Sequence, residues 1–287
     1  MSFGLPVAAL AAALFGSADF MGGLASRKAS ALTVTLIVSV IGAIPVWALS
    51  LWVHGTPTTV EMMWGALAGI AGATGVTGLY YVLARGPVGV VAPVAAVCGV
   101  VVPVFAGIAL GERPTIAALI GIACAVISVV LISAGAPATN APDASPPVRA
   151  SRSVIVLAIL SGLGLGAFLV CIARIGESAG LMPLIAARAS GTAVALTGFA
   201  IRREPPRLPP GSRLTAIGGS LVDGTANVLY LLVVRSHAVS IVATIVSLGP
   251  AFTIVLARFV LHERFHRRQL IGLAMAAGAV ILLTAGV

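Results

Sequence analysis

The sequence predicts an all-α membrane protein with about ten transmembrane helices in two inverted five-helix repeats. Hydrophobic residues make up 59% of the 287 residues, charged residues make up 9%, and the mean hydropathy is +1.13. These values exclude an ordinary soluble protein. The apolar runs are about 20 residues long, enough to cross a hydrocarbon core of about 30 Å, and they lack the alternation of a β-strand. An internal repeat completes the argument for two halves.

The repeat relates residues 86–135 to residues 237–286 without a gap. Its register is fixed by two tetrapeptides, Leu-Gly-Glu-Arg ending at Arg113 and Leu-His-Glu-Arg ending at Arg264, which are 151 residues apart. Matches that keep one register over about fifty positions indicate a common ancestor of the two halves. We therefore expect a first repeat at residues 1–135, a proline-containing flexible linker at 136–152 and a second repeat at 153–287.

The candidate spans follow from the positions of the apolar runs. They fall at about 5–25, 32–53, 62–85, 87–109, 115–134, 153–173, 181–201, 213–235, 238–261 and 268–287. An odd number of spans per repeat places the second half upside down relative to the first. This inverted-repeat arrangement is common in secondary transporters.

Connections between the runs alternate between two faces that differ in basic residues. The arginine-rich face carries the connections after the first, third, fifth, seventh and ninth runs, with Arg27, Lys28, Arg85, Arg149, Arg152, Arg202, Arg203, Arg207, Arg213, Arg264, Arg267 and Arg268. The arginine-poor face carries the remaining connections and both termini, with Arg113, Arg174 and Arg235. The positive-inside rule makes the arginine-rich face cytoplasmic and puts both termini outside. The net charge of +9 is therefore interpreted as a topology signal and not as a nucleic-acid surface.

No enzymatic, metal or cofactor site is predicted. The sequence contains no phosphate-binding glycine loop followed by lysine, no zinc-ligand pair, and no nucleophile with a plausible histidine and acid partner. Cys98, Cys124 and Cys171 lie inside apolar runs, so we interpret them as packing residues. The chain is therefore expected not to be an enzyme and not to use ATP by itself.

Three ionisable residues lie well inside the predicted spans, where each costs a few kcal/mol unless paired or hydrated. At about 1.5 Å per residue, Arg188 lies roughly 10 Å below the arginine-poor face and Asp223 roughly 14 Å from the arginine-rich face, levels within reach of one arginine side chain. Asp19 lies within about a helical turn of the level of Asp223. One interpretation is a structural Arg188–Asp223 ion pair. The second is a polar cavity in which Arg188 binds a substrate carboxylate, and Asp223 or Asp19 binds an amine or a proton.

Polar and aromatic residues near these charges are further candidates for substrate binding. Asn227 and Tyr230 follow Asp223 by four and seven residues, so the three share one helix face. Tyr80 and Tyr81 in the third run offer aromatic rings that could stack on a flat substrate or a cation. Tyrosines near a helix end also serve as interface anchors, so both roles stay open.

Prolines and glycines indicate where helices bend and where they pack closely. Pro93, Pro103 and Pro250 interrupt helix hydrogen bonding at about membrane depth and are candidate gating kinks or plain tolerated kinks. Glu112 and Glu263 sit at helix junctions and are expected to be structural caps or pairs. Small residues at packing spacings in the third run predict close helix contacts, at Gly65, Gly69, Gly72, Gly75 and Gly78.

Several motifs resemble a known family. Gly-Glu-Arg-Pro, which follows the fourth run, and the fifth run from Leu119 to Gly135 are similar to the ten-helix EamA-type branch of the drug/metabolite transporter superfamily. The second copy, from Ser247 to Phe265, resembles the same motif. The resemblance implies ten helices around a central cavity, alternating access and export of small metabolites across a bacterial inner membrane. Within the branch, the chain resembles the aromatic amino acid exporters. Many members of the branch have cytoplasmic termini, the opposite of what the charge bias predicts here.

The leading hypothesis is a secondary transporter that exports amino acids, aromatic ones among them, or related small metabolites. The expected partners are a small-molecule substrate, membrane lipid and protons, with coupling through Asp19 or Asp223 left open, and a monomer is compatible with the sequence. A competing hypothesis is a proton-coupled exporter of lipophilic cations, favoured by the charge of two aspartates against one arginine. The sequence is also compatible with a non-transporting membrane subunit or sensor, and with a lipid-carrier flippase that has a lateral opening between helices.

Overall fold

The fold consists of helices that are long and apolar enough to cross a membrane. The structure is a computed structural model and describes residues 4–83, 88–134, 151–261 and 266–285. The helices are α1 (Gly4–Ser26), α2 (Ala31–Ile41), α3 (Ala43–Ser50), α4 (Thr59–Leu83), α5 (Val88–Ala109), α6 (Ile116–Ala134), α7 (Arg152–Ala173), η1 (Glu177–Ala179), α8 (Met182–Arg202), α9 (Pro210–Val234), α10 (Val239–Val246), α11 (Gly249–Val260) and α12 (Arg267–Ala285). They form ten candidate spans in the described part of the chain, which confirms the predicted fold class.

The two halves show the same spacing of elements. Four helices of the second half, α8, α9, α10 and α12, each begin 151 residues after their counterparts α2, α4, α5 and α6. This interval equals the register of the sequence repeat. The linker predicted at residues 136–152 lies almost entirely outside the described residues, as do Arg85, Glu263 and Arg264.

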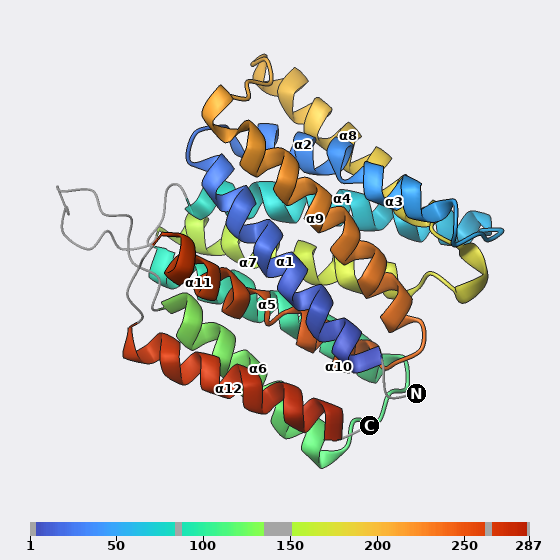
Figure 1. The fold of residues 1–287 in the computed structure, drawn as a ribbon, viewed down its shortest axis with the longest axis vertical. Coiled ribbons are helices and arrows are strands. Elements are labelled where there is room, and N and C mark those ends of the chain that lie inside the picture. The colour runs from blue at the N-terminus through green and yellow to red at the C-terminus, as the bar shows by residue number, and fades with distance from the viewer. Residues whose placement is uncertain (1–3, 84–87, 135–150, 262–265, 286–287) are drawn as a thin grey trace.

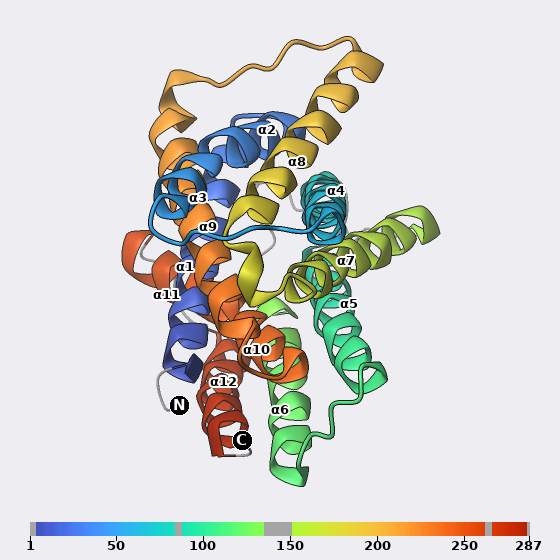
Figure 2. The same ribbon diagram turned by 90° about the vertical axis from the view of Figure 1, so that its right-hand side faces the viewer.

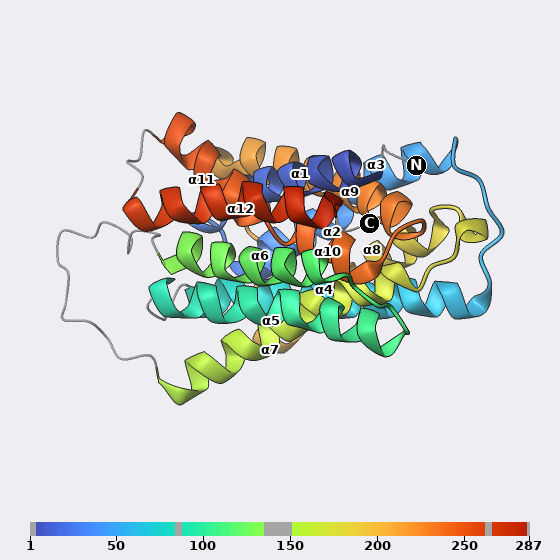
Figure 3. The same cartoon turned by 90° about the horizontal axis from the view of Figure 1, so that it is seen from below.

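Helices of one half pack mainly against helices of the other half. The most extensive contacts are those of α1 with α9, α4 with α7 and α6 with α12, and each pair joins the two halves. Figures 1 and 3 show α6 and α12 side by side at one edge of the bundle. Since α1 and α7 are the first spans of their halves, and α4 and α9 the third, these contacts have the symmetry expected of an interlocked repeat.

Two of the ten spans are broken into shorter helices. The second span, Ala31–Ser50, breaks at Gly42, because Pro45 has no N–H to donate to the carbonyl of Ile41. In the ninth span, Pro250 cannot donate to the carbonyl of Val246, and α10 ends there. Pro93 and Pro103, in contrast, lie inside α5, which continues through both. Of the three candidate kinks, only Pro250 accompanies a break in the helix, while all three gating roles stay predictions.

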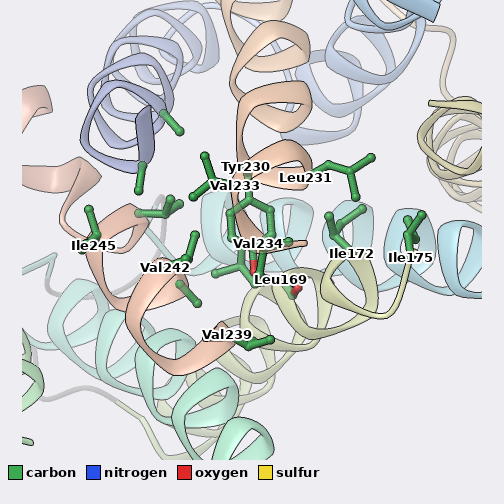
Figure 4. Packing of buried hydrophobic residues seen from close by; sticks show 14 of the residues in the cluster. Leu169, Ile172, Ile175, Tyr230, Leu231, Val233, Val234, Val239, Val242 and Ile245 are labelled. Atoms are coloured by element: carbon green, nitrogen blue, oxygen red, sulfur yellow. Dashed lines mark hydrogen bonds between the residues drawn. The ribbon is translucent and has the colours of Figure 1, made fainter. Parts of the chain in front are cut away.

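The main hydrophobic core lies toward the arginine-poor face. Its largest cluster collects the ends of helices that meet at that face, for example Ala8 of α1, Ile172 of α7, Leu184 of α8, Tyr230 of α9 and Val242 of α10. Figure 4 shows Tyr230 surrounded by aliphatic side chains of this cluster. Toward the arginine-rich face, smaller separate clusters replace it, such as the one around Ala25, Val34 and Ala216. The bundle is therefore packed as one core on one side only.

Candidate functional site

Arg188 of α8 and Asp223 of α9 form an ion pair within the bundle. The Nη2 atom of Arg188 lies 2.8 Å from Oδ2 of Asp223, and the two side chains are 12% and 20% exposed. The distance between the two charged groups makes the contact an ion pair. Nη1 donates to the carbonyl of Val38 at 3.4 Å. The sequence left open whether this pair is structural or part of a polar cavity, and the contact itself is compatible with both.

The break in the second span brings its backbone close to the ion pair. A Cβ atom on Gly42 would lie 3.1 Å from Nη1 of Arg188 and 3.1 Å from the carbonyl oxygen of Ser220, so a larger residue would displace the guanidinium. On the opposite side, Gly224 of α9 lies against Gly42 and Pro45, directly beside Asp223. Sequence reasoning missed Gly42 and Pro45, although a Gly-x-x-Pro pattern inside an apolar run signals a helix break.

Asn227 completes the polar part of α9, as its spacing from Asp223 predicted. Its Nδ2 donates to the backbone oxygen of Asp223 at 2.7 Å and to the Oδ2 carboxylate oxygen at 3.3 Å. Asn227 is buried, so it orients the carboxylate from behind and does not face solvent. Asp223 is therefore held by Arg188 on one side and by Asn227 on the other.

Asp19 of α1 has a different environment. It is exposed, although it lies in the interior of a membrane-spanning helix, and no hydrogen bond or ion pair to it is present among the described residues. Tyr80 of α4 lies close by: its hydroxyl would be 2.9 Å from a Cβ atom on Gly22, one turn along α1 from Asp19. Gly219 of α9 packs against Ala18 and Met21, so Asp19 and Asp223 flank the crossing of α1 and α9. Asp19, Tyr80, Arg188, Asp223 and Asn227 thus form one interior cluster, which we call the polar cluster.

The remaining two candidate tyrosines lie elsewhere. Tyr230 is fully buried in the main core, where its hydroxyl donates to the backbone oxygen of Leu169 at 2.9 Å. The sequence placed Tyr230 on the same helix face as Asp223 as a candidate for substrate binding, and in the structure α7 covers this tyrosine. Tyr81 contacts Arg202, whose Cζ lies 5.7 Å from the ring centroid, at the arginine-rich end of α4. Tyr81 therefore has the environment of an interface anchor, which was the second interpretation of its position.

Glu112, in the connection after α5, caps a helix of the second half. Its carboxylate oxygens accept hydrogen bonds from the backbone N–H groups of Val239 at 2.5 Å and Ser240 at 3.0 Å, at the start of α10. This confirms the expected capping role of Glu112. Its counterpart Glu263 lies outside the described residues.

With this geometry in view, a comparison with known protein families identifies the family. Residues 2–134 and, separately, residues 152–285 match the EamA-like transporter family. The chain belongs to this family. No curated protein matches its sequence. A solved structure described only as "Crystal structure of protein" resembles this EamA-like chain with a TM-score of 0.76 and 16% identity, covering 98% of this chain and 96% of that one. At that identity, the likeness concerns the fold alone.

Membership in the EamA-like family makes the chain an integral membrane protein and a transporter of small molecules. The family match accounts for both halves, in agreement with the resemblance found in the sequence motifs. In the part of the chain that the structure describes, no group of three His, Cys, Asp or Glu residues could hold a metal ion.

The electrostatics of the polar cluster favour a positively charged group. Arg188 is the one basic residue of the cluster and is already paired with Asp223. Asp19 remains as an accessible carboxylate, so the cluster carries a net negative charge when both aspartates are ionised. An ammonium group or a proton could occupy this position without displacing the ion pair. A substrate carboxylate, in contrast, would have to compete with Asp223 for Arg188.

Proposed function

We propose that this EamA-like protein is a secondary transporter that exports small amine-bearing metabolites, amino acids among them, across a bacterial inner membrane. The observation that carries the proposal is the accessible carboxylate of Asp19, which has no partner among the described residues and lies beside the Arg188–Asp223 pair. Charged residues at this depth are costly, and they are common along substrate and proton pathways. The family supports transport of small molecules, and the choice of substrate comes from the charges of the cluster.

In the proposed cycle, the substrate enters from the arginine-rich, cytoplasmic face. The single packed core at the opposite face and the separate clusters near the arginine-rich face support this side of entry. The substrate ammonium group binds Asp19, its carboxylate competes with Asp223 for Arg188, and an aromatic side chain stacks on Tyr80. The two inverted repeats then exchange conformations and expose the site to the far side of the membrane.

A second candidate is export of lipophilic cations in exchange for protons. The specific observation in its favour is that Arg188 is already neutralised by Asp223, so only negative charge is free in the cluster. A cation without a carboxylate would bind Asp19 and leave the ion pair intact. Proton binding to the same aspartate in the return step would then couple the two fluxes.

Flux into proteoliposomes containing the purified chain tests both candidates. Labelled aromatic and aliphatic amino acids and a lipophilic cation are compared in the wild type, Asp19→Asn and the double variant Arg188→Gln/Asp223→Asn. The double variant removes the pair without leaving one buried charge alone. Glu204→Gln, a neutralised exposed acid in the connection between α8 and α9, is the matched control.

Saturable amino acid flux that Asp19→Asn abolishes and the double variant weakens would support the proposal. Cation flux that needs Asp19 and survives the double variant would select the second candidate. Flux unchanged in Asp19→Asn would contradict both. No flux above empty vesicles for any of these solutes would favour a non-transporting subunit or sensor.

A further inference from the structure

A groove lies between α4 and α8 on the outside of the bundle. Its volume is about 470 Å³, within the usual range of ligand sites. Ile70 and Thr74 of α4 form one wall, Ala193, Thr197 and Ile201 of α8 form the opposite wall, and Leu32 of α2 contributes to the lining. The residues of the two walls are exposed. Figure 2 shows α8 running obliquely past α4, which is seen nearly end-on.

The positions of the glycines in α4 explain why the helices separate there. Near the arginine-poor face, Gly65 and Gly69 lie directly against the backbone of Pro183 and Ala187, so α4 and α8 touch. About two turns beyond Gly69, Gly75 and Gly78 lie against α7 at Ser161 instead. Because the small residues change partner along the helix, α8 leaves α4 and the groove opens toward the arginine-rich face.

The groove has the depth of one lipid leaflet. At about 1.5 Å per residue, Ala193 lies roughly 14 Å from the end of α8 at Arg202, and Thr74 lies roughly 14 Å from the end of α4. Half of a hydrocarbon core is about 15 Å thick, so the groove extends through about one leaflet. Toward the interior, the hydroxyl groups of Thr35 and Thr77 meet at 2.9 Å between α2 and α4. The exposed walls thus face the hydrocarbon region of the membrane, where lipid acyl chains are available to occupy the groove.

A cation lies at the mouth of the groove. Arg202, at the last position of α8, places its Cζ 5.7 Å from the ring centroid of Tyr81 on α4. Tyr81 is one turn beyond Thr77, which lines the groove, so Arg202 reaches across the two helices at the level of the lipid headgroups. Basic and aromatic residues at this level attract anionic headgroups, each basic residue contributing on the order of 1 kcal/mol.

We propose that this groove binds one acyl chain of an anionic phospholipid of the arginine-rich leaflet and that Arg202 binds its phosphate. The apolar walls hold the chain, and the guanidinium over Tyr81 selects the charge of the headgroup. This site is separate from the polar cluster and independent of the transported substrate. It assigns Tyr81 and Arg202 to lipid recognition.

Native mass spectrometry of the delipidated full chain tests the site, using phosphatidylglycerol and phosphatidylcholine with the same acyl chains as probes. The wild type should prefer phosphatidylglycerol by about fivefold. Arg202→Gln should remove most of this preference and keep the chain site, while Arg203→Gln, at the next exposed arginine, should not. Ala193→Trp fills the groove and should weaken binding of both lipids. Ala200→Trp adds the same ring at an exposed position outside the lining and should change neither.

Three results would overturn the proposal. They are equal binding of the two lipids by the wild type, a preference that Arg202→Gln keeps as fully as Arg203→Gln, and lipid binding by Ala193→Trp that equals that of Ala200→Trp. Ala193 and Ala200 are both exposed, so folding should survive either change, and size-exclusion chromatography verifies it. Since no substrate is present, failure of this site would leave the transport proposal untouched.

Discussion

Replacing Gly224 by alanine tests whether the close approach of α9 to the broken second span holds the polar cluster together. A Cβ atom at this position would lie 2.5 Å from Cγ of Pro45 and closer still to the carbonyl oxygen of Gly42, whereas ordinary contact begins at 3.4 Å. The helices would therefore have to separate by about 0.9 Å or more, against the resistance of backbone and a proline ring. Asp223 is the adjacent residue, so the shift also lengthens its 2.8 Å contact with Arg188.

The expected cost is that of overpacking, about 1 to 3 kcal/mol. For a chain of this size, 1 kcal/mol corresponds to about 2 to 4 °C in the melting temperature, so Gly224→Ala should melt roughly 2 to 12 °C lower. Gly218→Ala on the same helix is the matched control, because its Cβ atom would meet only Sδ of Met21, at 3.6 Å. That variant gains helix propensity of up to about 1 kcal/mol and should be neutral or more stable.

The assay is thermal unfolding of both purified variants in the same detergent, followed by amino acid or cation flux in proteoliposomes. Gly224→Ala should lose both stability and flux, and Gly218→Ala neither. A Gly224→Ala variant as stable and as active as Gly218→Ala would refute the argument, since the contact would then have no energetic or functional role.

Three further variants address separate parts of the structure. Tyr230→Phe removes the hydrogen bond to Leu169 and should cost about 1 kcal/mol in thermal unfolding without changing the KM of transport, whereas a raised KM would restore Tyr230 to the substrate site. Glu112→Gln removes the charge that caps α10 and should lower stability by about 1 to 2 kcal/mol. It should also speed thiol labelling of a Ser240→Cys probe at the start of α10, and unchanged labelling would contradict the capping role. Pro250→Ala lets Val246 accept a helical hydrogen bond and should stabilise the chain while slowing flux, so equal flux would show that the break is not used in transport.

Features that depend on length, hydropathy and spacing were predicted from the sequence. Ten spans follow from the lengths of the apolar runs, and the 151-residue register reappears in the starts of four helix pairs. The proximity of Arg188 and Asp223 followed from their similar depth and from the cost of leaving either charge alone in a membrane. The position of Asn227 beside Asp223 followed from helical periodicity.

Features that depend on which helices touch could not be predicted. In a membrane, both the lipid-facing and the core-facing sides of a helix are apolar, so periodicity does not reveal which side is buried. Tyr230 illustrates the difficulty: it shares a face with Asp223, yet α7 covers it and its hydroxyl bonds to Leu169. The pairing of α1 with α9 and of α4 with α7 could not be predicted for a related reason. Small residues show that a helix can make a close contact, but they do not show which helix it contacts.

The two broken spans do not occupy equivalent places in the two repeats. Position 193, which matches Gly42 in the 151-residue register, is alanine within continuous α8, and position 196, which matches Pro45, is leucine. Likewise, α5 continues through the positions that match the break between α10 and α11. If the two repeats exchange conformations during transport, the same conformation has its helix break in a different span in each repeat. The two end states are therefore not related by symmetry, so the repeat itself does not make their free energies equal when no gradient and no substrate are present.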